Sequence, residues 1–270
     1  MVAAANSKNK TMPTNALRRK QISELLPEGV LIDRDWLMEN NLSRHAIDNM
    51  VKSQQLHSVS KGIYVRGTSR VTWQSVVYAL QTILKMNFVI GGITALELQG
   101  LGHYLSLSGN QIIHLFGNDR LPGWVNELMP EVTFLRHTNN NLFSFDPESA
   151  PHLFTVTREW KEGLGKLILS SPERAFLELL SDVPRRISPE HASQLMQGLT
   201  TLAPRNLQKL LEECGNVKVK RLFFWLAEKY NYIWLNKLDI TKIDLGSGNR
   251  MLVKGGKLDK KYKITVPNSL

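Results

Sequence analysis

The segment that most constrains the fold is 33–67, where two short helical patterns and a hairpin pattern follow one another with few residues between them. Asp33 stands directly before the first helical pattern, and Ser43 stands directly before the second. Both residue types are preferred helix N-caps, because their side-chain oxygens accept hydrogen bonds from backbone N–H groups of the first turn. Only a tight turn is left between the two helices, which is the spacing of a helix-turn-helix.

A β-hairpin is expected directly after the second helix. Residues 56–60 and 63–66 are short runs rich in β-branched or apolar side chains, and Lys61 and Gly62 separate them. The glycine supplies the positive φ that a two-residue hairpin turn requires. A helix-turn-helix followed by such a hairpin predicts a winged helix-turn-helix domain, which is a module that binds duplex DNA. An ordinary surface helix and hairpin remains the alternative interpretation of the same residues.

The second helix of this pattern has one apolar and one polar face. At 100° per residue, one side collects four apolar residues, namely Ala46, Ile47, Met50 and Val51. The opposite side carries Arg44, His45, Asp48, Asn49 and Lys52. A recognition helix needs this division, because its apolar face packs inside the domain while its polar face offers donors and acceptors to base edges.

The polar face and the hairpin predict specific contacts with DNA. Asparagine can pair with adenine, arginine with guanine, and lysine with guanine or phosphate. The candidate groove residues are therefore Arg44, His45, Asn49 and Lys52. Asp48 either accepts a hydrogen bond from cytosine or points away from the DNA. The tip of a wing lies over phosphates, and Lys61 and Arg66 carry suitable charges for such contacts.

The charge distribution agrees with a nucleic-acid partner. The chain of 270 residues has a formal net charge of +10 and a sequence isoelectric point near 9.7. Residues 1–70 and 216–270 are both basic, whereas residues 71–215 are mildly acidic. Basic segments of this kind favour nucleic acid or another anionic surface as partner, although lysines spread over a surface also serve simply to keep a protein soluble.

The order of patterns predicts an α+β fold, with a winged domain at 14–70 followed by a larger mixed α/β domain at 71–270. Residues 1–13 are expected to be a disordered arm, and residues 14–26 the first helix of the winged domain. The larger domain should open with a helix at 73–85. Its predicted strands are 88–90, 111–116, 131–136, 153–156 and 166–169. Four helices follow: Ser171 and Ser188 are the predicted N-caps of the first two, and the next two begin near Pro204 and Val219. A basic, β-rich tail begins at Ile240.

The pair Gly91 and Gly92 separates the first of these strands from a helix. We expect Thr94 to be the N-cap of that helix and Glu97 to complete a capping box. Such a glycine pair either binds an anion at the helix N-terminus or lets the strand turn sharply onto the helix. The absence of Lys or Arg from the first helical turn favours the sharp turn.

Motifs for catalysis or cofactor binding are missing from the sequence, which has no nucleotide-binding glycine motif, no zinc-protease motif and no nucleophile elbow. We therefore predict no enzymatic activity, no cofactor and no metal. The stretch holding His103, His114, His137 and His152 lacks the spacing of metal ligands. One or two of these histidines could meet in space, but we interpret them as structural or surface residues. Glu173 and Glu178 are five residues apart and do not share a helix face, so they do not form a catalytic pair.

The sequence also bears on cellular compartment. The single cysteine, Cys214, excludes an internal disulfide. No run of about 18 apolar residues is present, and the polar N-terminus lacks the apolar core of a signal peptide. We therefore expect a cytosolic protein that is associated with the nucleoid through DNA binding and has no membrane partner.

Four stretches in a fixed order carry a resemblance to a known family. They are SKGIYVRG in the hairpin, FVIGGITALELQGLGHYL at 88–105, LILSSPERAFLELL at 167–180, and the run at 217–267. Together they resemble the AbiEi-type antitoxins of type IV toxin–antitoxin systems over nearly the whole chain. The stretch at 88–105 is the most distinctive, and none of the four is a catalytic signature.

The resemblance implies an N-terminal winged domain that binds inverted repeats in the promoter of its own operon and represses it. It implies a C-terminal domain with antitoxin activity and a role in phage defence. The partner gene would encode a nucleotidyltransferase-like toxin, whose effect the antitoxin counters without forming a stable complex. Direct masking of the toxin, or a nucleic-acid-modifying enzyme targeted by the winged domain, are the alternatives.

The same resemblance extends the candidate DNA interface. On the matched segment it assigns Arg44, His45, Asn49 and Lys52 to the groove and Lys61 and Arg66 to the backbone. On the first helix, Arg18, Arg19 and Lys20 would add phosphate contacts. The lysines of the basic tail are Lys254, Lys257, Lys260, Lys261 and Lys263. They either extend this footprint, contact RNA or an acidic partner, or form a solvated face.

Overall fold

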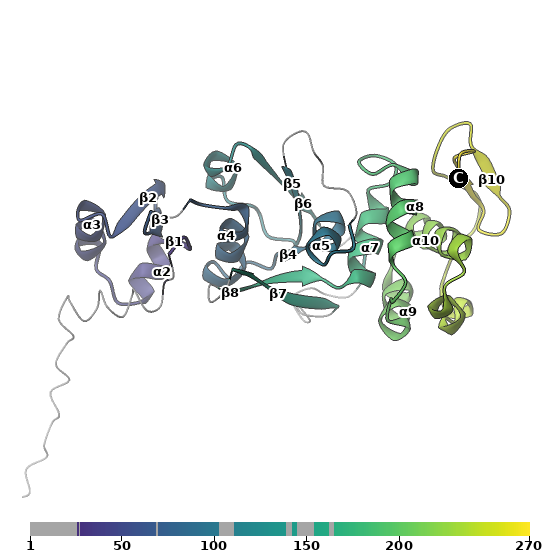
Figure 1. Ribbon diagram of the computed structural model, residues 1–270, viewed down its shortest axis with the longest axis horizontal. Helices are drawn as coiled ribbons and strands as arrows, with labels where there is room; N and C mark the ends of the chain where they lie inside the picture. Colours follow the sequence, from purple (N-terminus) through teal and green to yellow (C-terminus); the bar gives the residue numbers. More distant parts are fainter. Residues whose placement is uncertain are drawn as a thin grey trace, which may run out of the picture. The chain divides into compact units, whose positions relative to one another are not determined.

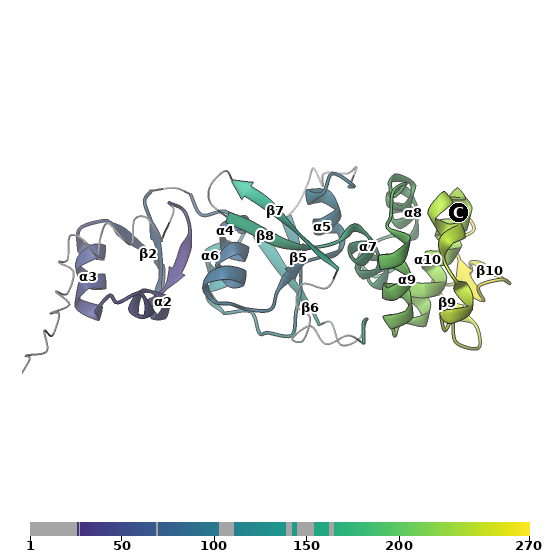
Figure 2. The ribbon, with the colours of Figure 1, turned by 90° about the horizontal axis from the view of Figure 1, so that it is seen from below.

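A computed structural model of the chain describes Leu26 and residues 28–68, 70–102, 111–138, 142–144, 154–161 and 165–270. The chain divides into two compact units between Ala79 and Leu80, which Figures 1 and 2 show from two sides. The predicted arm at 1–13 and the predicted first helix, apart from Leu26, lie outside the described residues. An N-terminal unit with a helix-turn-helix and a larger mixed α and β unit confirm the expected α+β class.

The first unit contains the helix-turn-helix and its hairpin. Its elements are β1 (Leu31–Asp33), α2 (Arg34–Glu39), α3 (Arg44–Lys52), β2 (Leu56–Ser60), β3 (Ile63–Arg66) and α4 (Trp73–Tyr78). The three strands form one antiparallel sheet in the order β1-β3-β2. Gly62 has a φ of 76°, so the two-residue turn has the positive φ that the sequence predicted. The segment directly before α2 thus adds β1 as an edge strand to the hairpin.

Both predicted helix caps in this unit are confirmed. The Asp33 carboxylate accepts a hydrogen bond from the Trp36 backbone N–H at 2.8 Å. The Ser43 hydroxyl accepts one from the Ala46 N–H at 3.2 Å. Each cap satisfies an N–H group that has no partner within its helix. The start of the second helix, and with it the direction of its polar face, is therefore fixed by local sequence.

The helix predicted at 73–85 changes its winding part of the way along. It is α-helical from Trp73 to Tyr78 and continues as a π-helix, η1 (Ala79–Ile83). Gln81 lies in this π-helix, and its buried side-chain amide donates to the carbonyls of Phe88 and Ile168 at 2.9 Å each. The same amide accepts from the Ile168 N–H at 3.0 Å. Gln81 thus pairs with the backbone as a neighbouring strand would, and the wider helical turn accompanies that pairing.

The second unit is built on a five-stranded mixed sheet. Its strands are β4 (Val89–Ile90), β5 (Gln111–Phe116), β6 (Val132–His137), β7 (Thr155–Lys161) and β8 (Gly165–Ser170), in the order β6-β5-β4-β8-β7. The pairs β5·β6 and β4·β8 are parallel, and the pairs β4·β5 and β7·β8 are antiparallel. Four predicted strands are confirmed within one or two residues, whereas β7 continues five residues beyond the end of the strand predicted at 153–156. The sheet is teal in Figure 1, with the green helices beyond its edge.

Six α-helices complete the second unit in the described residues; the first two lie between strands in the chain, and the other four follow β8. They are α5 (Gly92–Leu98), α6 (Trp124–Leu128), α7 (Pro172–Ser181), α8 (Pro189–Gly198), α9 (Pro204–Glu213) and α10 (Val217–Tyr230). The predicted caps Ser171 and Ser188 accept hydrogen bonds from first-turn N–H groups. In α7, every residue from Glu173 to Leu180 is buried, because the helix is surrounded by α5, α8, α9, α10 and β8. This central helix connects the sheet to the helical part of the unit.

The predicted cap of α5 is wrong. The helix begins at Gly92 and its N-cap is Gly91, which makes no side-chain cap bond. Thr94 lies inside the helix, where its hydroxyl accepts from the His114 backbone N–H at 3.1 Å and lies 3.4 Å from the Ile112 carbonyl. The capping sequence is therefore overridden by pairing with β5. The sharp turn expected at the glycine pair is present, and Gly92 has a φ of 54°.

The first turn of α5 is contacted by a carboxylate of the same chain. The carboxylate of Glu178 on α7 is fully buried and accepts from the Gly92 N–H at 3.0 Å. It also accepts from the Ser170 hydroxyl at 3.0 Å and from Nε of Arg174 at 2.8 Å. A buried carboxylate is tolerated only with such partners. Glu178 therefore joins β8, α7 and the start of α5.

The C-terminal tail is organised by one buried arginine. Beyond the 3-10 turns η3 (Ile233–Lys237) and η4 (Ile240–Lys242), the strands β9 (Arg250–Met251), β10 (Lys257–Asp259) and β11 (Ile264–Val266) form a small sheet. Arg221 on α10 is 1% exposed, and its guanidinium donates to four backbone carbonyls of this tail. They belong to Leu245, Gly246, Gly248 and Lys263, at 2.6–3.0 Å. The tail thus folds around the Arg221 guanidinium, whose N–H groups donate hydrogen bonds to backbone carbonyls of the tail.

The close approach at Gly91 gives a stability prediction. A Cβ at this position would lie 2.2 Å from Oε2 of Glu178 and 2.4 Å from Phe116, and both side chains are buried. Gly91→Ala should therefore destabilise the second unit. Overpacking typically costs about 1–3 kcal/mol, and we expect a loss of at least this size. The free energy of unfolding in urea measures this loss.

Gly123→Ala is the matched control, because its Cβ would meet nothing within 4 Å and its φ is −58°. This control should stay within about 0.5 kcal/mol of the wild type. Equal stability of the two variants would contradict the constraint at Gly91.

Candidate nucleic-acid interface and histidine cluster

The polar face of α3 is exposed, as a recognition helix requires. Arg44, His45 and Lys52 are exposed, and Asn49 is half-buried. Ile47 is 0% exposed and forms the opposite, packed face together with Met50. The four candidate groove residues thus lie on one helix that is anchored by its apolar side. The exposed polar face and packed apolar face of α3 fit a recognition helix, and contact of α3 with DNA stays a prediction.

The two wing candidates differ in their surroundings. Lys61 lies at the exposed tip of the hairpin. Arg66 is half-buried at the other end of β3, and its guanidinium donates to the carbonyl of Leu26 at 2.8 Å. Its backbone carbonyl accepts from the Gly29 N–H at 3.1 Å. Arg66 therefore ties the end of β3 to the segment that precedes β1, whereas Lys61 extends from the wing tip.

Arg34, which the sequence reasoning did not single out, connects the elements of the interface. Its guanidinium donates to the Tyr64 hydroxyl, with Nε at 3.1 Å and a terminal nitrogen at 2.6 Å. It also lies 3.9 Å from the carboxylate of Asp48 on α3. Asp48 thus has a cationic partner inside its own domain, which favours the interpretation that it points away from DNA. The contact joins residues far apart in sequence, so no local pattern signals it.

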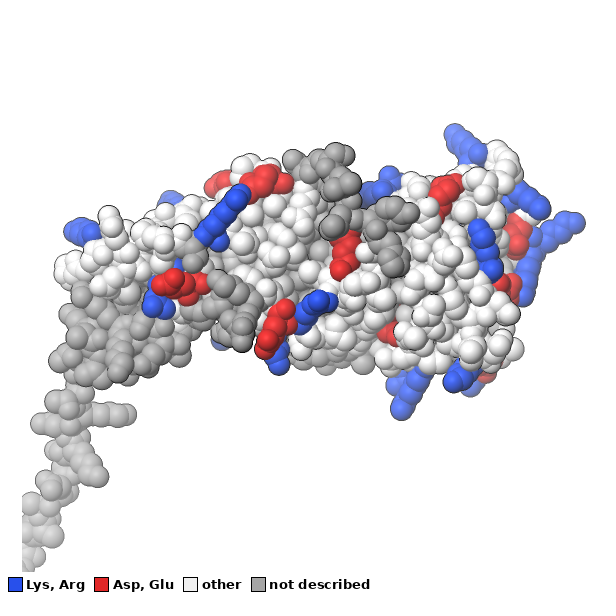
Figure 3. All heavy atoms as spheres, in the orientation of Figure 1, with Lys and Arg blue, Asp and Glu red and all other residues white. Residues whose placement is uncertain are grey.

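The remaining basic candidates fall into two groups. Arg18, Arg19 and Lys20 lie outside the described residues. All five tail lysines named above are exposed, and Figure 3 shows Lys and Arg side chains extending from the C-terminal end of the chain. One of them, Lys261, forms an ion pair with Glu228 and lies over the ring of Tyr262. The tail is therefore a basic, exposed surface.

The sheet brings two of the four scattered histidines together. In the parallel pair β5·β6, His114 is aligned with Leu135 and Phe116 with His137. Side chains alternate between the faces of a sheet, so His114, Phe116 and His137 share one face. Nδ1 of His114 lies 3.0 Å from Nε2 of His137. The ring of Phe116 stacks on that of His137, with centroids 4.4 Å apart.

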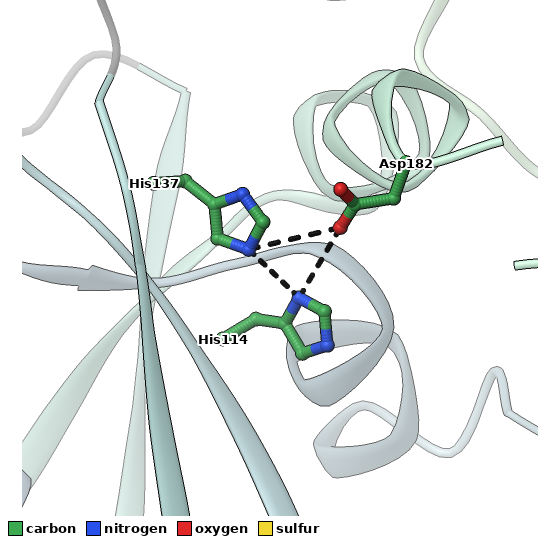
Figure 4. Close-up of side chains that lie close together, drawn as sticks. All are labelled: His114, His137 and Asp182. Atoms are coloured by element: carbon green, nitrogen blue, oxygen red, sulfur yellow. Dashed lines mark hydrogen bonds and ion pairs between the residues drawn. The ribbon is translucent and has the colours of Figure 1, made fainter. Parts of the chain in front are cut away.

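An aspartate completes this cluster. Asp182 is the C-cap of α7, and its Oδ2 lies 3.6 Å from Nδ1 of His114 and 3.7 Å from Nε2 of His137. Its other oxygen accepts from the guanidinium of Arg186 at 3.1 Å. Figure 4 shows the two ring nitrogens and the carboxylate oxygen facing one another. We call His114, His137 and Asp182 the histidine cluster.

Burial sets the charge state of both imidazoles. Loss of hydration lowers the pKa of His114 to about 4, and the neighbouring His137 ring adds to this effect against the attraction of Asp182. The pKa of His137 is lowered for the same first reason. At neutral pH both rings are therefore uncharged. Each neutral ring has one nitrogen lone pair that can accept a hydrogen bond or bind a metal ion.

The cluster changes one interpretation made from the sequence. Linear spacing did not mark His114 and His137 as partners, because the register between two parallel strands brings them together. His103 and His152 lie outside the described residues. Glu173 and Glu178 take separate roles, as expected, since Glu173 accepts from the Ala203 N–H at 2.7 Å while Glu178 holds α5. Cys214 is buried and is not bonded to another cysteine.

Comparison with known families agrees with this architecture. Residues 15–107 match the family described as "Transcriptional regulator, AbiEi antitoxin N-terminal domain". Residues 110–267 match "Transcriptional regulator, AbiEi antitoxin, Type IV TA system". The two matches cover most of the chain, so this protein belongs to the AbiEi antitoxin family of transcriptional regulators. No match was found among curated proteins.

The fold is also shared with a solved structure. The crystal structure of the RV2827C protein from Mycobacterium tuberculosis is similar, with a TM-score of 0.54 and 15% sequence identity. The match covers 96% of this chain and 93% of that one. At this identity the likeness shows the fold alone. Among the described residues, no helix has the length and apolar character needed to cross a membrane.

Proposed function

We propose that this chain is a DNA-binding autorepressor and antitoxin that binds inverted repeats in the promoter of its own operon. One observation carries the DNA-binding part. The polar face of α3 is exposed beside a hairpin with an exposed lysine at its tip. Major-groove reading by such a helix, with phosphate contacts from the wing, is the usual use of this arrangement. Family membership supports the regulatory and antitoxin roles.

The proposed antitoxin role is directed against a nucleotidyltransferase-like toxin encoded by the neighbouring gene. We propose that it acts in the cytoplasm, at the nucleoid, as part of a phage-defence system, and without catalysis or a stable complex with the toxin. A direct test is co-purification of the two proteins, where a stoichiometric complex would favour direct masking instead. A nucleotidyltransferase-like reading frame directly downstream would support the proposed system type.

Lys61→Ala should weaken binding to all duplex sequences by a similar factor. The lysine is at the exposed wing tip, where it is suited to neutralise a phosphate and release its counterion. The slope of log K against log salt should therefore fall by about one unit. Fluorescence anisotropy with the upstream promoter DNA and with an unrelated duplex, at several salt concentrations, measures both quantities.

Lys209→Ala is the matched control for this experiment. Lys209 is exposed on α9 in the second unit, and its replacement removes the same charge from a residue outside the winged domain. Binding and salt slope should match the wild type. If Lys209→Ala and Lys61→Ala behave alike, the effect comes from net charge and the wing assignment is wrong.

Asn49→Ala should instead change sequence discrimination. An asparagine that pairs with adenine contributes about 1–3 kcal/mol of preference for that base. Its removal should relax the preference at one base pair of each repeat while the salt slope stays unchanged. Binding to a set of promoter duplexes with single base substitutions measures this. Discrimination identical to the wild type at every position would remove Asn49 from the groove contacts.

A further inference from the structure

We propose that the histidine cluster binds one first-row divalent transition-metal ion, of the class of Zn²⁺ or Fe²⁺. The inference concerns the second unit and does not depend on the DNA-binding function proposed above. It starts from three side chains contributed by β5, β6 and α7 whose potential ligand atoms all lie within 4.8 Å of one another. Their types, two imidazoles and one carboxylate, are the common protein ligands of such ions.

The distances fit a single ion. The three ligand atoms form a triangle with sides of 3.0, 3.6 and 3.7 Å. The point equidistant from its corners lies about 2.0 Å from each atom, which matches usual Zn–N and Zn–O distances of about 2.0–2.2 Å. An ion at or slightly above this point would be bound without moving the side chains, and further coordination positions would stay open.

The surroundings hold the ligands in place. Phe116 stacks on the ring of His137, and Arg186 takes the second oxygen of Asp182, leaving Oδ2 to face the rings. Such outer contacts orient metal ligands and are a regular part of metal sites. The side chains of His114 and Asp182 are 6% and 8% exposed, and that of His137 is 13% exposed. An ion would therefore be largely shielded from water, with His137 nearest to solvent.

The ligand set also selects among ions. Mg²⁺ and Ca²⁺ prefer oxygen ligands, and Mg²⁺ keeps much of its water shell, so a site with two nitrogens and one oxygen disfavours both. Zn²⁺ suits three protein ligands with an open position, and Fe²⁺ suits two histidines and a carboxylate on one face. Both ions share this coordination chemistry, and the experiment separates them.

The competing interpretation is a hydrogen-bonded histidine pair with a nearby aspartate and no ion. In that case one ring N–H donates to the other ring, and Asp182 contributes charge alone. The two interpretations differ in a measurable way, because only a metal site concentrates an ion at a stoichiometry of one and needs all three side chains.

The test uses the full chain purified without a histidine tag. The protein is stripped with chelator and titrated separately with Zn²⁺, with Fe²⁺ under anaerobic conditions, and with Mg²⁺, and bound metal is counted after dialysis. We expect one ion per chain for Zn²⁺ or Fe²⁺ and none for Mg²⁺. Because Zn²⁺ generally binds more tightly than Fe²⁺ to the same ligands, Fe²⁺ is assigned as the preferred ion only if it binds at least as tightly as Zn²⁺.

Three variants assign the site. His114→Gln, His137→Gln and Asp182→Asn should each weaken binding by more than about 100-fold, since loss of an outer partner alone costs roughly 10–100-fold. His57→Gln, which removes a histidine from β2 in the other unit, should bind as the wild type does. Circular dichroism checks that each variant is folded. Asp182→Asn keeps the size of its side chain and serves if a histidine variant unfolds.

Cobalt gives a readout from the ligands themselves. Co²⁺ bound by these residues should show a visible absorption band that is lost in Asp182→Asn and retained in His57→Gln. Absence of stoichiometric metal in the wild type would overturn the proposal. Metal that stays bound with unchanged affinity in all three cluster variants would also overturn it, because the ion would then lie elsewhere on the chain.

Discussion

The buried carboxylate of Glu178 is the interaction on which the architecture of the second unit depends. Burial raises its pKa, while the charge of Arg174 and the hydrogen bonds from Gly92 and Ser170 oppose that rise. Removing one partner of such a group costs several kcal/mol, because a buried charge is left without compensation. The carboxylate therefore fixes three things together: the end of β8, the direction of α7 and the start of α5. Gly91 makes this possible, since any side chain there would occupy the space of the carboxylate.

The histidine cluster is a consequence of the same arrangement. Asp182 follows Glu178 by four residues and caps the end of α7, so both carboxylates project from the same side of the helix. Once Glu178 is fastened to the first turn of α5, Asp182 is brought to the sheet face that carries His114 and His137. Thr94 adds a link from α5 to the backbone of His114 itself. Neither histidine needs to be placed by a local motif, because the helix and the sheet are already fixed.

Local signals and long-range contacts explain what the sequence could predict. The caps at Ser43, Ser171 and Ser188 and the turn at Gly62 depend on neighbours within a few residues, and all four were predicted. Thr94 matched a capping pattern, yet pairing with β5 drew it into the helix. The proximity of His114 to His137 depends on the register of two parallel strands, which no local pattern contains. In the candidate interface, α3 and the hairpin were predictable from local signals. The contacts of Arg34 with Tyr64 and Asp48 join distant residues and were not predictable.

The arginines of the first unit show why a basic residue on a DNA-binding domain cannot be assigned to DNA from its charge alone. Arg34 and Arg66 both have oxygen partners inside the domain, and turning either guanidinium fully toward a phosphate would break a charge-assisted hydrogen bond. Such a bond is worth more than a typical exposed ion pair, so an exchange brings little net gain in binding. Arg44, Lys52 and Lys61 are exposed, and their side chains are therefore accessible to a ligand. Among the described cations of the first unit, these three are therefore the main candidates for contacts with DNA, while Arg34 and Arg66 hold α2, α3 and the wing in the geometry that presents them.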